Sequence, residues 1–230
     1  MGRFQEARNH LEEALALLNR GSEQAETYEG LALVYLGLTV HILGDTEEAS
    51  RLCALAIEFA RHRRASVFAA ALGNSLYLLY MQSDVQQTRR TCSELSRLAE
   101  EKGFLMWYHQ ARFFHGWAST VEGDKNGLEI MEASMTRFRN ANELVEQSFF
   151  YGVLAETYLT ANCPERALEN VERGLELVNR LGERFFEAPL LRIKAKCLSR
   201  APGAATAAEI SDLFAQAETL SKVQGAMAWH

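Results

Sequence analysis

Cysteine and histidine are the residue types in this 230-residue sequence that could hold a metal or carry redox chemistry. The 4 cysteines are far apart and form no C-x-x-C pair: Cys53, Cys92, Cys163 and Cys197. Three of them lie inside apolar helical patterns, where a free cysteine behaves as a small hydrophobic residue. His109 and His115 are six positions apart, which separates them around a helix. The sequence therefore predicts reduced structural thiols and no metal or other cofactor.

Motifs that bind phosphate or activate a nucleophile are absent from the sequence. It contains no G-x-x-x-x-G-K-S/T, H-E-x-x-H, G-x-S-x-G or G-x-G-x-x-G pattern. The glutamate pairs Glu12-Glu13, Glu47-Glu48 and Glu100-Glu101 are typical of solvated helix faces, and a catalytic carboxylate pair is the less favoured interpretation. We therefore expect a chain that is not an enzyme.

Charge and hydropathy exclude two further classes of partner. The sequence has 24 Lys and Arg against 30 Asp and Glu, a net charge of −6, whereas nucleic-acid and anionic-membrane binding need a basic surface. Its basic clusters are Arg61 to Arg64 and, to a lesser extent, Arg89-Arg90, and helix-end solvation is favoured over ligand binding for the first. The longest apolar stretches, Gly30 to Leu43 and Val67 to Met81, are shorter than the ~20 residues that span a bilayer. Without an apolar N-terminal signal region, the sequence predicts a cytoplasmic protein with no nucleic-acid or membrane partner.

A repeat of about forty residues organises the elements that would position any functional side chain. Its clearest copy runs from Leu33 to Ala56, with a Gly44-Asp45 turn between two helical patterns. Gly37 and Ala49 have almost no side chain, so two antiparallel helices can lie close together there. The equivalent mid-helix positions recur every 39 or 40 residues: 37, 76, 116, 155 and 195.

The repeat predicts an all-α fold, an α-solenoid of about eleven helices in a single domain over 1–230. It consists of a half-hairpin followed by five hairpins: 1–20, 25–63, 65–102, 104–140, 143–181 and 184–223. The opening matches the second helix of a hairpin, and the tail from Gln224 to His230 is typical of a helix start. We therefore expect a fragment of a larger protein, with self-association through its exposed ends.

These small-residue positions resemble the tetratricopeptide (TPR) repeat, with Leu36-Gly37, Gly44-Asp45, Ala49 and Ala56 as the best match. The longer period, together with Leu154 to Tyr158 and Leu181 to Lys194, is similar to helical arrays of bacterial regulators. In those regulators the array follows an AAA-type ATPase, often with a class III adenylate/guanylate cyclase or winged-helix domain upstream. The resemblance implies TPR-like hairpins in a right-handed superhelix. No ATPase or cyclase residue can be carried over, because no part of this chain matches those domains.

The sequence departs from that family pattern at four positions. Pro189 stands where that group usually has an acidic residue, although proline is tolerated in the first turn of a helix. Ser75, Arg112 and Ser119 stand at positions that the repeat predicts to be apolar. The middle hairpins are therefore expected to differ from the repeat in helix boundaries or packing.

The concave face of the solenoid is the predicted partner-binding groove. Its residues follow i, i+4 and i+7 spacing on the first helix of each hairpin: Val34, Leu38, His41, Tyr77, Tyr80, Phe113, Trp117, Glu156, Arg192 and Lys196. Aromatic anchors in the first half are typical of peptide recognition, and Arg192 and Lys196 could pair with an acidic segment. The alternative for Phe113, Phe114 and Trp117 is core between adjacent hairpins, and the sequence leaves both open. The basic and Asn pattern that clamps a C-terminal carboxylate is not present.

Together these features predict a non-catalytic module for protein–protein interaction or regulatory sensing in a bacterial signalling ATPase or cyclase-type regulator. Its partners would be a protein or peptide and, in a longer chain, the neighbouring ATPase or cyclase domain. Binding along the groove would change the curvature of the solenoid and bias the output domain. The alternatives are a stand-alone TPR adaptor and a solenoid that binds a peptide or small ligand.

Overall fold

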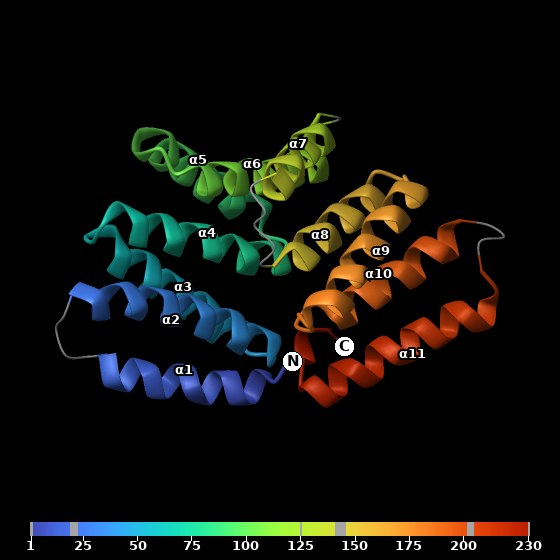
Figure 1. Cartoon of the computed structure of the whole chain (residues 1–230), viewed down its shortest axis with the longest axis horizontal. Coiled ribbons are helices and arrows are strands. Elements are labelled where there is room, and N and C mark those ends of the chain that lie inside the picture. Colours follow the sequence, from blue (N-terminus) through green and yellow to red (C-terminus); the bar gives the residue numbers. More distant parts are fainter. Residues whose placement is uncertain (1, 19–22, 125, 141–145, 202–204, 230) are drawn as a thin grey trace. The chain divides into compact units, whose positions relative to one another are not determined.

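The computed structural model describes residues 2–18, 23–124, 126–140, 146–201 and 205–229 (Figure 1). Within these ranges there are eleven α-helices, one short 3-10 helix and no strand. Their bounds are α1 (Phe4–Leu18), α2 (Glu23–Ile42), α3 (Thr46–Arg61), α4 (Ala65–Met81), α5 (Val85–Lys102), α6 (Leu105–Val121), α7 (Gly127–Asn140), α8 (Gln147–Thr160), α9 (Pro164–Leu181), α10 (Glu187–Arg200), α11 (Ala207–Gln224) and η1 (Met227–Trp229). The predicted all-α fold of about eleven helices is confirmed. None of the helices in this part of the chain combines the length and the apolar character that crossing a membrane requires.

Two compact units divide the chain: an N-terminal unit of residues 4–118, and a C-terminal unit of residues 1–3 with 119–230. In the N-terminal unit α2 packs on α3 and α4 packs on α5, and α2 also contacts α4 of the next pair. In the C-terminal unit α8 packs on α9 and α10 packs on α11, and α9 contacts α10. Each unit is thus built of stacked helical hairpins, as in an α-solenoid. A single continuous domain and the right-handed superhelix stay predictions.

Tight turns separate the two helices of a hairpin in the way that the repeat predicts. Gly44 has a φ of 106°, and the Asp45 side chain then accepts a hydrogen bond from the backbone N–H of Glu48 at 3.0 Å. Ser83, with a φ of 56°, and Asp84 repeat this arrangement before α5. The left-handed residue reverses the chain, and the aspartate satisfies an otherwise unpaired N–H at the start of the second helix.

Close backbone approach at small residues holds neighbouring helices together. A Cβ atom on Gly37 would lie 2.9 Å from the Sγ of Cys53 and 3.1 Å from the carbonyl oxygen of Ala49, and Ala49 is fully buried. The predicted contact of α2 with α3 at these residues is therefore confirmed. Gly73 does the same between α4 and α6, because a Cβ atom there would run into the ring of Trp107. The carbonyl of Gly73 also accepts a 2.8 Å hydrogen bond from the Nε2 of Gln110.

The three polar departures from the repeat have different structural explanations. Ser75 and Ser119 are buried, and the hydroxyl of Ser75 donates to the carbonyl of Leu72 at 2.7 Å. A serine whose hydroxyl bonds to its own helix fits a buried position. Arg112 is exposed, so the apolar position that the repeat predicted there is wrong. That exposed position on α6 belongs to the candidate site described next.

Candidate functional site

Most of the first half of the predicted groove lies in the interior. The buried side chains, each at most 7% exposed, are Val34, His41, Tyr77, Tyr80, Phe113 and Trp117, whereas Leu38 is half-buried. The ring of Tyr77 meets Phe114 edge-on at 5.9 Å between centroids, and Tyr80 meets Trp117 at 5.3 Å. These aromatic pairs join α4 to α6, which places Phe113, Phe114 and Trp117 in the core between hairpins. A partner could reach them only if α4 and α6 moved apart, so binding through these rings stays a prediction.

The buried imidazole of His41 closes the turn between α2 and α3. Its Nδ1 lies 3.2 Å from the hydroxyl of Thr46. Burial lowers the pKa of His41, so the ring is held neutral at physiological pH. The geometry gives His41 a role in the turn.

The charged residues of the predicted groove already make contacts within the C-terminal unit. The carboxylate of Glu156 lies 3.6 Å from the Nζ of Lys196. The guanidinium of Arg192 donates to the carbonyl of Trp229, the last residue of η1. An acidic partner at these positions would have to compete with the intramolecular groups.

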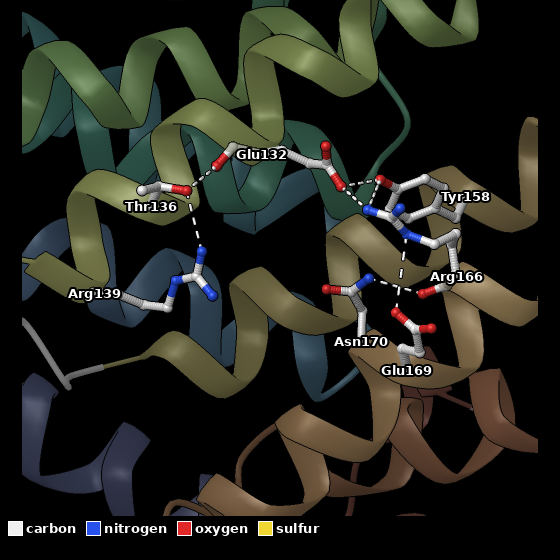
Figure 2. Close-up of polar contacts among 7 residues, drawn as sticks. All are labelled: Glu132, Thr136, Arg139, Tyr158, Arg166, Glu169 and Asn170. Atoms are coloured by element: carbon white, nitrogen blue, oxygen red, sulfur yellow. Dashed lines mark hydrogen bonds and ion pairs between the residues drawn. The ribbon is translucent and has the colours of Figure 1, made fainter.

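A polar network that the sequence did not indicate links α7, α8 and α9 (Figure 2). The hydroxyl of Tyr158 and the guanidinium of Arg166 both donate to the carboxylate of Glu132, and Arg166 also lies 3.9 Å from Glu169. The carbonyl of Arg166 accepts a 2.7 Å bond from the Nδ2 of Asn170. Only tertiary packing brings these residues together, because Glu132 and Arg166 are 34 positions apart.

The electrostatics of this network favour a structural role. Burial, and then the hydrogen bond to the Glu132 carboxylate, raises the pKa of Tyr158. The phenol therefore keeps its proton at neutral pH and acts as a donor, which does not suit a nucleophile or a base. The network holds α7 against the α8–α9 hairpin of the C-terminal unit.

A polar cleft lies between α5 and α6 of the N-terminal unit. We call it the α5–α6 cleft, and its volume is about 370 Å³. Its walls are Arg89, Cys92, Ser93, Ser96 and Glu100 from α5, with Tyr108, Arg112 and His115 from α6. A shallower surface beside it, here the α5 strip, consists of Arg89, Arg90, Ser93, Glu94 and Arg97. Arg89 and Ser93 belong to both, so the two surfaces are continuous.

Arginine side chains dominate the charge of this combined surface. The guanidinium of Arg112 lies 5.9 Å from the centre of the Tyr108 ring, and Arg97 lies 4.0 Å from Glu101. Glu94 of the α5 strip accepts a 2.7 Å hydrogen bond from Arg61, so its negative charge is already matched. The surface therefore carries an excess of positive charge in a chain whose net charge is −6.

The side chains of the cleft are better suited to binding a ligand than to catalysing a reaction. Burial raises the pKa of the Cys92 thiol, which keeps it neutral and weakly nucleophilic. Across the residues that the structure describes, no group of three His, Cys, Asp or Glu side chains is placed to hold a metal ion. Guanidinium groups and serine hydroxyls instead suit hydrogen bonding to oxyanions such as carboxylate or phosphate.

Sequence reasoning identified parts of this cleft without joining them. In the sequence Arg89 stands out only as half of a lesser basic pair, and Arg112 only as a departure from the repeat. A signal for the α5 wall does exist, because Arg89, Ser93, Ser96 and Glu100 follow helical spacing. Nothing local indicates that α6 forms the opposite wall.

Comparison with known proteins adds a fold relationship. Neither a family model nor a curated protein sequence matches this chain. Among solved structures, the crystal structure of BtubC (BKLC) from P. vanneervenii is similar, with a TM-score of 0.58 and 13% sequence identity. The match covers 96% of this chain and 90% of that one. At this identity the likeness concerns the fold alone.

Proposed function

We propose that the chain is a non-catalytic protein–protein interaction module, the regulatory or sensing part of a bacterial signalling ATPase or cyclase-type regulator. The observation that carries the proposal is the α5–α6 cleft, an accessible polar cleft of about 370 Å³ between two hairpins. Convergent polar groups in a concave surface are what a protein uses to orient a ligand. The family resemblance of the repeat supplies the regulatory context.

The packing beneath the cleft supports a route from binding to regulation. Its α6 wall is seated on α4 through the Trp107 ring over Gly73 and the bond from Gln110 to the Gly73 carbonyl. A partner that contacts both α5 and α6 would therefore favour one angle between the α4–α5 hairpin and α6. A change of that angle would alter solenoid curvature and bias an attached ATPase or cyclase domain.

Cysteine chemistry supports a cytoplasmic location within this proposal. All four cysteines are free, and Cys53, Cys92 and Cys197 are buried. Free thiols are typical of reducing compartments, whereas small domains of oxidising compartments use disulfides.

Site-specific photocrosslinking in cells that naturally express the chain tests the proposal. A photoreactive residue replaces exposed Ser93 in the cleft, and a matched variant carries it at exposed Arg173 on α9. We expect a discrete protein adduct at position 93 and none at position 173. The adduct's identity then separates a regulator from a stand-alone adaptor: an ATPase or cyclase chain supports the first, and two unrelated proteins support the second.

The remaining outcomes contradict the proposal or favour a named alternative. No adduct at position 93 or at any other exposed cleft position would overturn protein binding at this site. The size of the cleft also suits a small ligand, because pockets for such ligands begin at roughly 300 Å³. A low-mass compound retained by the intact chain in native mass spectrometry, without a protein adduct, would favour the ligand-binding solenoid.

A further inference from the structure

We infer that the α5–α6 cleft and the α5 strip bind an acidic peptide segment of a partner protein. Arg90, Arg97 and Arg112 would pair with its carboxylates. The inference rests on the proposed function, since it specifies the chemistry of the partner at the same site. Three observations carry it: local charge, hydrogen-bonding groups and spacing.

The local charge is opposite to the charge of the whole chain. The combined surface has four arginines, Arg89, Arg90, Arg97 and Arg112, against two glutamates, Glu94 and Glu100. Arg61 already pairs with Glu94 at 2.7 Å, and Glu101 lies 4.0 Å from Arg97, so Glu100 and Glu101 together still leave positive charge in excess among the four arginines. The net charge of −6 repels an acidic segment from most of the chain, whereas the arginines of the combined surface attract it. This contrast directs the segment to the combined surface.

The hydrogen-bonding groups suit a peptide. A guanidinium presents paired N–H donors that match the two oxygens of a carboxylate. The hydroxyls of Ser93 and Ser96 can donate and accept, as a peptide backbone requires. Tyr108 lines the same wall of the cleft, with the Arg112 guanidinium 5.9 Å from the centre of its ring. Arg90, Arg97 and Arg112 are exposed, whereas Arg89 and His115 are half-buried, so we assign the main contacts to the three exposed arginines.

The spacing along α5 indicates the form of the ligand. Arg90 and Arg97 are seven residues apart on one helix, which separates them by about 10 Å along its axis. A peptide in the polyproline II conformation, with three residues per turn and a rise of about 3.1 Å per residue, covers that distance in about three residues and presents those side chains on one face. The surface therefore favours acidic residues spaced about three apart over a single isolated carboxylate.

Fluorescence anisotropy with the full chain tests this inference. The probes are a labelled twelve-residue peptide with glutamate at every third position and the same peptide with glutamine in those places. We expect binding of the glutamate peptide that weakens about tenfold between 50 and 200 mM salt, and no binding of the glutamine peptide. The double variant Arg97→Glu/Arg112→Glu should weaken binding by about tenfold or more.

A matched control separates local contacts from global charge. The variant Arg173→Glu/Arg180→Glu makes the same change in net charge on exposed positions of α9, and its affinity should stay within about twofold of the unchanged chain. Circular dichroism of both variants checks that they fold. Equal binding of the two peptides, or an equal loss in the control, would overturn the inference, and so would preference for a single-stranded oligonucleotide of matched charge. If position 93 crosslinks a protein but the glutamate peptide does not bind, the acidic partner is wrong and the proposed function stands.

Discussion

Replacement of Gly37 by alanine tests the close approach of α2 and α3, on which the repeat depends. A Cβ atom at this position would lie 2.9 Å from the Sγ of Cys53 and 3.1 Å from the carbonyl oxygen of Ala49. The second obstacle is a backbone atom of Ala49, a residue with no exposed surface, so it cannot rotate out of the way as a side chain could. The helices must separate or bend to admit the methyl group.

Gly30 on the same helix supplies the control. A Cβ atom there would lie 3.4 Å from the nearest side-chain atom, of Val67, which is ordinary van der Waals contact. Gly30→Ala should therefore stabilise the N-terminal unit by about 0.5–1 kcal/mol, because alanine is the better helix former and restricts the unfolded chain. Gly37→Ala gains the same amount but adds an overpacking cost of about 1–3 kcal/mol. We expect Gly37→Ala to be less stable than Gly30→Ala by about 1–3 kcal/mol.

Urea unfolding, monitored by tryptophan fluorescence, measures the difference in stability between the two variants. Two of the 3 tryptophans, Trp107 and Trp117, lie in the N-terminal unit, and Trp229 lies in the C-terminal unit. In a Trp229→Phe background the signal reports the N-terminal unit alone. Midpoint and slope together give the free energy of unfolding of each variant.

Equal stabilisation by the two alanines would refute the reasoning, because it would mean that Gly37 has room for a side chain. The double variant Gly37→Ala/Cys53→Ala sharpens the test, since it removes the sulfur obstacle and leaves the Ala49 carbonyl in place. In the background of Cys53→Ala, the replacement Gly37→Ala should lower the free energy of unfolding by less than it does in the unchanged chain, because part of the overpacking is relieved.

Four further predictions concern other parts of the molecule. Tyr158→Phe should destabilise the C-terminal unit by about 1 kcal/mol in urea unfolding, because Glu132 loses a hydrogen bond; an unchanged midpoint would contradict the network. Burial raises the thiol pKa of Cys53 to about 12, that of Cys197 to about 11, and also that of Cys92. In the folded chain at pH 8, a thiol reagent should therefore modify half-buried Cys163 first. Since these native pKa values exceed the unfolded one, stability should fall as pH rises above about 8.5, which pH-dependent melts would detect. Thr206→Ala should destabilise α11 by about 1 kcal/mol through loss of its N-terminal cap, whereas Thr219→Ala within the same helix should not; equal midpoints would refute the cap.

The helical content and the hairpin turns follow from local sequence. Small residues at Gly37 and Ala49, and the Gly44-Asp45 turn, act over one or two helical turns, so their effect is readable without knowledge of the rest of the chain. These signals recur about every forty residues, and for that reason the fold class could be predicted as a whole.

The local sequence does not show which face of a helix lies in the core. Almost every residue of α4 from Val67 to Tyr80 is buried, so apolar spacing on α4 does not distinguish a groove from a packed interface. Tyr77 and Tyr80 illustrate this, because their spacing suits either role and their contacts with α6 decide it.

The sequence by itself determined the type of each element and the positions of the turns, because both depend on neighbours within a few residues. Only the tertiary structure decided the candidate site. Arg89 and Arg112 line one cleft because α6 rests on α4, where Gly73 leaves space for Trp107 and its carbonyl meets Gln110. That contact joins residues 37 positions apart, and no local rule of spacing or charge specifies it.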